Sequence, residues 1–158
     1  MKKLLSVLML VCAIFTNAKA EETNDKILVA YFSATGNTKD VAEKLAAAIN
    51  ADLFEIVPEQ LYTSDDLNWQ NNQSRSSIEM GDRSSRPVIS SKIDDMAQYK
   101  IVFVGSPIWW GREPSIIDTF IESYDFSDKR LYLLSHRAAV TSAIMVQTCN
   151  HWHQMQKS

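Results

Sequence analysis

A loop of small hydroxyl, amide and glycine residues stands between an apolar run and a helical pattern. Its residues are Ser33, Ala34, Thr35, Gly36, Asn37 and Thr38. A helix that begins here leaves its first backbone N–H groups unpaired, at the positive end of the helix dipole. A phosphate can accept hydrogen bonds from these N–H groups, and nearby hydroxyls can donate further ones. The loop therefore predicts a phosphate site that needs no lysine.

The segments on either side of this loop predict a strand and a helix. Residues 27–32 are a β-branched and aromatic run of strand length. After the loop, Val41, Leu45 and Ile49 recur at helical spacing, with alanines beside them. We therefore expect a strand–turn–helix unit in which the loop forms the turn.

The loop also has a purely structural explanation, because Ser, Thr and Asn are common helix caps. The two common nucleotide-binding fingerprints do not match it. The spacing G-x-x-x-x-G-K-[ST] is absent, and G-x-G-x-x-G fails because Gly36 is the only glycine of the loop. Taken alone, the loop leaves a phosphate site and a simple helix cap both open.

A pair of tryptophans follows the clearest strand pattern in the chain. Residues 101–104 are a continuous apolar run, as expected of a parallel strand covered on both faces. The next segment contains Pro107, Ile108, Trp109, Trp110 and Gly111. A helix is expected to start near Pro114. Neighbouring residues that leave a strand point in different directions, so at least one indole should face a ligand or solvent.

The hydroxyl-rich loop resembles the [ST]-x-T-G-x-T phosphate loop of the flavodoxin family. The match is made by Ser33, Thr35, Gly36 and Thr38, and Asn37 is also typical of the family. The resemblance extends from Lys26 to about Lys129. It implies an α/β fold with the doubly wound parallel sheet known from flavodoxin, in the order 2-1-3-4-5. In that fold the loops after strands 1 and 3 flank the ligand crevice.

The resemblance implies a noncovalent FMN site built from two sets of residues. The phosphate set is Ser33, Thr35, Gly36, Asn37 and Thr38, and the ring set is Pro107, Ile108, Trp109, Trp110 and Gly111. An indole stacked on the flavin ring contributes about 1 kcal/mol beyond the buried area. FMN carries its own redox chemistry, so no catalytic side chain is predicted.

The function expected from this resemblance is electron transfer or flavin-dependent oxidoreduction. The expected partner is a redox protein or a quinone-type small molecule. The alternative is a non-redox or defective domain of the same fold, which would bind another phosphate ligand or a protein partner. Fold alone does not decide between them.

A long polar stretch separates the second predicted strand, at residues 52–57, from the third. It runs from Leu61 to Lys92, is rich in Ser, Asn, Asp and Arg, and is too long for a structureless loop in a small domain. We expect a lid or an insertion that carries a short helix. Its arginines, Arg75, Arg83 and Arg86, are predicted to be solvated rather than to contact a ligand.

The first twenty residues have the pattern of a signal peptide. Lys2 and Lys3 precede an apolar stretch over residues 4–15, and Ala18-Lys19-Ala20 is a small-x-small cleavage site. The stretch is shorter than the roughly 20 residues that span a bilayer, which disfavours a membrane anchor. We expect cleavage after Ala20 and an exported protein, periplasmic or secreted, with no stable membrane span after cleavage.

The charge of the chain argues against a nucleic-acid partner. The 158 residues include 19 acidic and 16 basic side chains, for a formal net charge of −3. Loss of the three lysines of the leader would make this −6, and an acidic protein repels a phosphate backbone. Cys149 would then be the only cysteine, which excludes an internal disulfide.

The composition changes abruptly after Asp128. From there on the chain has no glycine, proline, phenylalanine or acidic residue, and it holds His136, His151, His153 and Cys149. Histidine and cysteine are common metal ligands. This segment, however, follows neither a strand nor a helix pattern, so no metal site is predicted.

We interpret this change as a shift of reading frame. If the codons for residues 136–157 are read one base earlier, permissible synonymous choices give TSGGSDIGNNGANLQPLAPNAK, which is similar to the flavodoxin family. The predicted organisation is a signal peptide at 1–20, a flavodoxin-like domain at 21–135 and an aberrant tail at 136–158. The fifth strand and last helix are then missing or altered, with reduced stability and weaker FMN binding.

Overall fold

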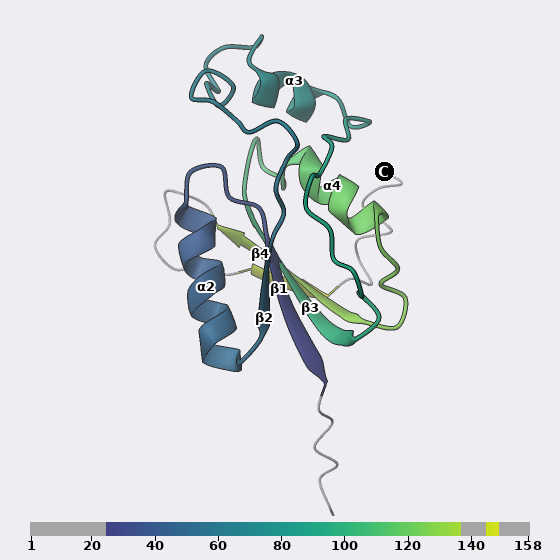
Figure 1. Cartoon of the computed structure of the whole chain (residues 1–158). Helices are drawn as coiled ribbons and strands as arrows, with labels where there is room; N and C mark the ends of the chain where they lie inside the picture. The colour runs from purple at the N-terminus through teal and green to yellow at the C-terminus, as the bar shows by residue number, and fades with distance from the viewer. Residues whose placement is uncertain (1–24, 137–144, 149–158) are drawn as a thin grey trace, which may run out of the picture.

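The computed structural model describes residues 25–136 and 145–148 of the chain. Figure 1 shows one sheet with helices packed against it and a long excursion between two of its strands. The signal peptide predicted at 1–20 lies outside the described residues. Most of the tail predicted at 136–158 lies outside them as well.

The sheet has the strand order β2-β1-β3-β4-β5. Its strands are β1 Lys26–Tyr31, β2 Asp52–Glu55, β3 Tyr99–Pro107, β4 Arg130–His136 and β5 Met145–Thr148. The first four are parallel, and Ala30 of β1 lies between Phe54 of β2 and Val104 of β3. The predicted α/β fold and the parallel order 2-1-3-4 are therefore confirmed.

The fifth strand is altered, as expected. It pairs with β4 in the antiparallel sense, with Ser135 beside Met145, whereas the predicted parallel sheet of order 2-1-3-4-5 has a parallel strand here. Only residues 137–144 connect the two strands. A parallel partner needs a crossover of about a dozen residues or more, so this connection is long enough only for an antiparallel partner.

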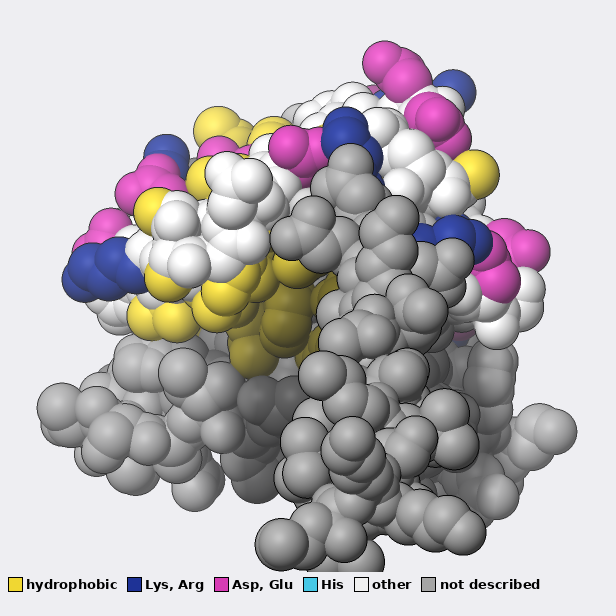
Figure 2. All heavy atoms as spheres, turned by 90° about the horizontal axis from the view of Figure 1, so that it is seen from below, with side chains coloured by type: hydrophobic (Ala, Val, Ile, Leu, Met, Phe, Trp, Pro, Cys, Tyr) yellow, Lys and Arg dark blue, Asp and Glu magenta, His cyan; other side chains and the backbone are white. Residues whose placement is uncertain are grey.

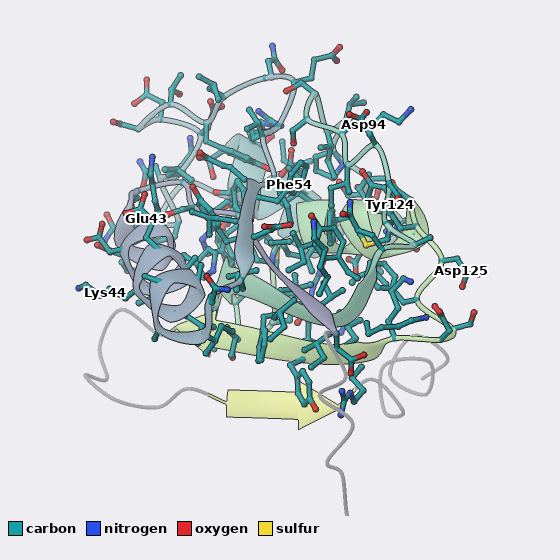
Figure 3. All side chains as sticks on the ribbon, turned by 60° about the horizontal axis from the view of Figure 1, so that its bottom comes forward. Glu43, Lys44, Phe54, Asp94, Tyr124 and Asp125 are labelled. Atoms are coloured by element: carbon teal, nitrogen blue, oxygen red, sulfur yellow. The ribbon has the colours of Figure 1, made fainter. Side chains whose placement is uncertain are left out.

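Both faces of β1 are buried, because its residues alternate between two helix layers. Leu28 and Ala30 join the larger core cluster, whereas Val29 and Tyr31 pack on the opposite face with Ala42 and Ala46 of α2. Helix α2, Asn37–Ile49, follows the predicted helical pattern. Its outer face carries Glu43 and Lys44, which point away from the sheet (Figure 3).

Helix α4, Ser115–Glu122, covers the larger core cluster. Ile116, Ile117 and Phe120 are each at most 1% exposed. Pro114 is the N-cap residue of the helix rather than its first helical residue. Seen from below, acidic and basic side chains lie around the outer edge of the described surface, and hydrophobic side chains show near its centre (Figure 2).

The polar stretch between β2 and β3 is an ordered insertion that carries the expected short helix. Helix α3, Arg75–Gly81, begins at Ser74, whose hydroxyl accepts a hydrogen bond from the N–H of Ser77. Pro58 and Ile89 form an antiparallel bridge that holds the two ends of the insertion together. Figure 1 shows α3 and its loops beyond the carboxyl ends of β1 and β3.

Candidate functional site

A cavity of about 490 Å³ lies where the loops after β1 and β3 meet the insertion. This is the point at which the strand order reverses, because β1 connects to β2 on one side and β3 connects to β4 on the other. The volume lies in the range of about 300–1,000 Å³ that is typical of small-molecule sites. Within the described chain, no charged side chain lines this cavity.

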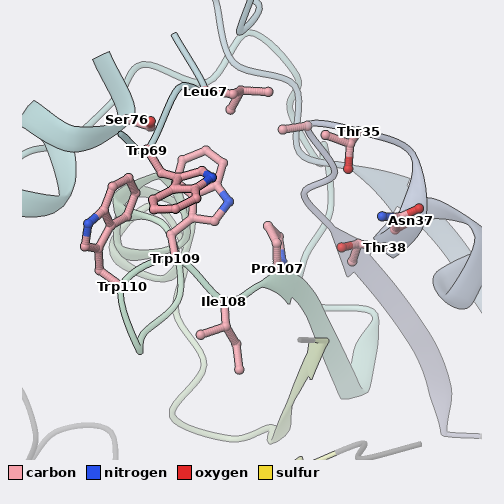
Figure 4. Close-up of a pocket in the computed structure, with 11 residues that line it drawn as sticks. Thr35, Asn37, Thr38, Leu67, Trp69, Ser76, Pro107, Ile108, Trp109 and Trp110 are labelled. Carbon is pink, nitrogen blue, oxygen red and sulfur yellow. The ribbon is translucent and has the colours of Figure 1, made fainter. Parts of the chain in front are cut away.

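One end of the cavity is polar and is formed by the start of α2. Thr35, Asn37 and Thr38 line it (Figure 4). The N-cap residue Gly36 has φ 92° and offers no side chain to the helix. The N–H of Asp40 is the first in α2 to donate to a backbone carbonyl, that of Gly36 at 3.1 Å, so in the described structure the earlier N–H groups of the helix are available to a ligand.

Ser33 shapes this loop instead of lining the cavity. Its Oγ accepts a hydrogen bond of 3.1 Å from the backbone N–H of Gly36. This bond closes a turn just before the helix, and the positive φ of Gly36 lets the chain enter α2 without the steric cost that a side chain would add. Ser33 and Gly36 therefore set the direction of the N–H groups that face the cavity.

The other end of the cavity is apolar and is formed by the segment after β3. Pro107, Ile108, Trp109 and Trp110 line it, opposite the threonines (Figure 4). The Trp109 ring packs edge-on against Phe32, with ring centroids 5.8 Å apart, and against Tyr62, at 5.4 Å. Trp110 is 53% exposed. The prediction that at least one indole faces a ligand or solvent is confirmed.

The two tryptophans are held by a tight turn. The N–H of Trp109 donates to the carbonyl of Arg112 at 2.8 Å, and the N–H of Arg112 donates back at 3.1 Å. Between them, Trp110 has φ 47° and Gly111 has φ 88°, as in a type I′ turn. Gly111 adopts this backbone freely, whereas Trp110 carries strain of about 1–2 kcal/mol. Gly111 shapes the turn and does not line the cavity.

The insertion forms the third wall of the cavity, which the sequence analysis missed. Leu67, Trp69 and Ser76 line this wall, and Trp69 is 69% exposed. Leu67 and Trp69 are apolar residues in a polar stretch, and the family resemblance includes Trp69; these two signals could have indicated a role there. Their distance along the chain from both predicted loops concealed it.

The prediction that Arg75 is solvated is wrong. Its side chain is only 21% exposed, and its Nε donates to Glu79 at 2.7 Å. The guanidinium lies over the ring of Tyr62, whose hydroxyl donates to the same Glu79. Arg83 is exposed as predicted, and Arg86 is exposed but forms a two-bond ion pair with Glu122.

Burial raises the pKa of three side chains that do not line the cavity. Burial, followed by the hydrogen bond to Glu79, raises the pKa of Tyr62 far above its ordinary range, so this phenol stays neutral. Burial likewise raises the pKa of Asp118 and of Glu113, although the nearby Arg112 opposes the shift. Of these groups, Tyr62 contacts the lining residue Trp109, and none of the three lines the cavity itself.

Two absences hold for the residues that the structure describes. No helix within 25–136 is both long and apolar enough to cross a membrane. No cluster of three or more histidine, cysteine, aspartate or glutamate side chains in the described part of the chain is arranged to hold a metal ion. The histidines and Cys149 considered in the tail lie outside the described residues or have no described side chain.

Comparison with known proteins places the chain in a family. The family model for flavodoxin matches residues 26–157. A crystal structure of a candidate flavoprotein from Bacteroides eggerthii is 50% identical, with 74% of each chain covered and a TM-score of 0.72. Another from Bacteroides uniformis is 45% identical, covering 73% of this chain and 74% of that one, with a TM-score of 0.71.

A more distant structure shows the same fold. It is a flavoprotein in complex with FMN from Lactobacillus acidophilus, 24% identical, with 73% of this chain and 77% of that chain covered and a TM-score of 0.59. No curated protein matches this chain significantly. The α/β sheet, the switch-point cavity and the family match agree, and the chain belongs to the flavodoxin family.

Proposed function

We propose that this chain binds FMN noncovalently and acts in electron transfer or flavin-dependent oxidoreduction. The observation that carries the proposal is the division of one cavity into two ends. Unpaired N–H groups and hydroxyls gather at one end, and indoles gather at the other. FMN has a phosphate at one end and a flat apolar ring at the other. The FMN complex of the Lactobacillus acidophilus flavoprotein supports the choice of ligand.

The residues of the phosphate end fit a dianion without any cationic side chain. The free N–H groups at the start of α2 carry the positive end of a 13-residue helix. The hydroxyls of Thr35 and Thr38 lie beside them and can donate further hydrogen bonds. Ser33 acts indirectly, because its Oγ fixes the N–H of Gly36.

The residues of the ring end fit the flavin ring. Pro107, Ile108 and Trp109 offer an apolar surface, and the Trp109 indole is fixed from two sides by Phe32 and Tyr62. FMN, when bound, supplies the redox chemistry by accepting one or two electrons. The chain would orient the ring, exclude water from its face and set its surroundings through uncharged contacts. A redox protein or a quinone-type molecule is the proposed partner.

The experiment that tests this proposal compares FMN with riboflavin, which lacks the phosphate. Each is titrated into the purified chain, and quenching of flavin fluorescence is followed. We expect saturable binding of both, with FMN bound more tightly. Thr35→Ala should weaken FMN binding about tenfold and leave riboflavin binding unchanged, because a charge-assisted hydrogen bond contributes about 1.5–3 kcal/mol.

The matched variant is Trp109→Ala, which should weaken the binding of both flavins to the same extent. No quenching by either flavin would refute the proposal and favour the non-redox or defective domain. Equal losses for FMN and riboflavin in Thr35→Ala would show that the loop of α2 does not hold the phosphate.

We also propose that the protein is exported after cleavage following Ala20, because residues 1–20 have the pattern of a signal peptide. N-terminal sequencing of the protein from its native host tests this. A chain that begins at Glu21 agrees with the proposal, and a chain that retains Met1 contradicts it.

The frame shift before residue 136 remains a proposal as well. Resequencing the gene across codons 129–136 tests it. A single-base difference or a slip site there agrees with the proposal, whereas a confirmed frame with neither contradicts it.

A further inference from the structure

Three indoles line the apolar part of the cavity. Trp109 and Trp110 come from the turn after β3, and Trp69 comes from the insertion (Figure 4). A flat ring has two faces, so one bound flavin can stack on two indoles at most. The third indole at this end must therefore face something else, either solvent or a second molecule.

Trp69 is the indole with the most surface to offer. It is 69% exposed, compared with 53% for Trp110, while Trp109 is partly buried against Phe32 and Tyr62. An exposed indole leaves a large apolar surface in water, and Leu67 extends that surface along the same wall. An apolar wall of this kind, at the mouth of a cavity, is typical of a binding surface.

The loop that carries Trp69 is held in place on both sides. Before it, the carboxylate of Asp66 accepts hydrogen bonds of 2.8 Å from the N–H and the hydroxyl of Thr63. The carbonyl of Asp66 also accepts from the N–H of Ser76 in α3 at 3.0 Å. After Trp69, the N–H of Asn71 donates to the carbonyl of Asn68 at 3.0 Å. The backbone of this loop is therefore preorganised, so binding at Trp69 need not order the loop itself.

The insertion itself is fastened to the rest of the fold. The hydroxyl of Ser115 in α4 donates to the carbonyl of Glu79 in α3 at 3.0 Å. Glu79 also joins Arg75 to Tyr62, and Tyr62 contacts Trp109. The insertion that carries Trp69 is therefore joined to the turn that carries Trp109 by direct contacts.

The chemistry of the cavity restricts the second molecule to an uncharged one. No charged side chain lines the cavity in the described chain, and the free N–H groups lie at the opposite end, beside Thr35 and Thr38. A dinucleotide would bring phosphates to an end whose described lining offers neither a cationic side chain nor the free N–H groups of a helix start. A neutral planar ring loses little hydration and gains stacking on an indole.

We propose that Trp69 is the stacking face of a second subsite, in which a flat, uncharged aromatic molecule of the quinone class binds next to the flavin ring. This inference rests on the proposed FMN site and names the class of small-molecule partner for it. In this arrangement Trp69 contacts the second molecule, and the segment from Pro107 to Trp110 contacts the flavin ring.

The experiment uses the oxidised, FMN-loaded chain and 1,4-naphthoquinone as the probe, with binding measured by titration calorimetry. Trp69→Ala should raise the dissociation constant of naphthoquinone about 5- to 10-fold. It should change the dissociation constant of FMN less than about twofold. Trp69→Phe retains an aromatic face and should restore most of the affinity. A sulfonated naphthoquinone should bind more weakly than the neutral one.

The control variant is Leu61→Ala, which removes another exposed apolar side chain of the insertion, one that does not line the cavity. It should leave naphthoquinone and FMN binding unchanged. The inference is overturned if Trp69→Ala leaves naphthoquinone binding intact. It is also overturned if the wild-type chain does not bind naphthoquinone. A loss of FMN affinity in Trp69→Ala overturns it too, because Trp69 would then cover the flavin. If the chain binds no FMN, the flavin titration described above already refutes the proposed function, and this result is distinct from a failure of the present inference.

Discussion

The guanidinium carbon of Arg75 lies 4.1 Å from the centre of the Tyr62 ring. Tyr62 in turn packs edge-on against Trp109. Arg75 of the insertion therefore contacts Trp109, a lining residue of the cavity, indirectly through the Tyr62 ring. Glu79 completes the group by accepting hydrogen bonds from both Arg75 and Tyr62. The insertion is thus part of the site through packing as well as through the residues that line it.

Arg75→Ala should lower the free energy of unfolding by about 2–3 kcal/mol. The substitution removes a cation–π contact and leaves the Glu79 carboxylate, which is 12% exposed, without its cation. Denaturant titration measures the change. Arg83→Ala is the control, because Arg83 is exposed, and it should cost less than about 0.5 kcal/mol. Equal effects of the two substitutions would contradict a structural role for Arg75.

Gly36→Ala should destabilise the fold by about 1–2 kcal/mol through backbone strain alone. Gly36 has φ 92°, and an added Cβ would meet no atom within 4 Å. Because the same strain turns the N–H groups of α2 away from the cavity, FMN affinity should fall and riboflavin affinity should not. Chemical denaturation and flavin titration measure the two effects.

Gly81→Ala is the matched control for this substitution. Gly81 lies in α3, has no positive φ and also has open space around its Cβ position. Alanine there should leave stability unchanged or raise it by about 0.4–1 kcal/mol. If Gly81→Ala destabilised the fold as much as Gly36→Ala, the left-handed backbone of Gly36 would not be the cause of the destabilisation.

Trp110→Asn should raise the free energy of unfolding of the ligand-free protein by about 0.5–1 kcal/mol. Asparagine tolerates the left-handed backbone that Trp110 adopts at φ 47°, and the exposed indole contributes little packing. Flavin affinity should fall at the same time, because the ring end loses an aromatic side chain. Thermal unfolding with and without FMN separates the two effects, and a less stable ligand-free variant would disprove the strain.

Stability at alkaline pH should depend on Tyr31. Burial, together with the hydrogen bond to Glu55, raises the pKa of Tyr31 from 10.0 to about 12. The folded state therefore holds this proton more tightly than the unfolded chain does. Its contribution to stability is complete below pH 10 and is lost as the pH rises through about 12. Tyr31→Phe should flatten the fall in unfolding free energy over this range, as measured by denaturant titration at successive pH values.

A chain whose residues 136–157 are replaced by TSGGSDIGNNGANLQPLAPNAK should bind FMN more tightly, on the order of tenfold. This tail could supply the crossover that a parallel fifth strand needs, in place of the antiparallel β5. Flavin titration of the two chains tests the expectation. A replacement chain with unchanged affinity would argue against the proposed frame.

Much of the architecture follows from local pattern. The apolar runs at residues 27–32 and 101–104, and the helical spacing of Val41, Leu45 and Ile49, are enough to predict two parallel strands and the helix after the first. The hydroxyl-rich loop between the first strand and that helix matches the phosphate-loop motif of the flavodoxin family. Strands and helices of this kind depend on neighbours a few residues away, so short stretches of sequence determine them.

The third wall of the cavity depends on tertiary structure. Nothing near Trp69 in the chain indicates that it lines the same cavity as Trp109, because the two come together at this site only when the insertion folds over the sheet. The burial of Arg75 has the same origin, since its partners Tyr62 and Glu79 surround it only in the folded insertion.

The sequence by itself determined the α/β class, the phosphate-type loop and the tryptophan turn, because each is encoded by residues close together in the chain. The tertiary structure alone decided which aromatic side chains share the cavity, which loop residues shape the site without lining it, and the antiparallel direction of β5. These properties depend on contacts between residues that are far apart in the chain, and local propensity does not specify such contacts.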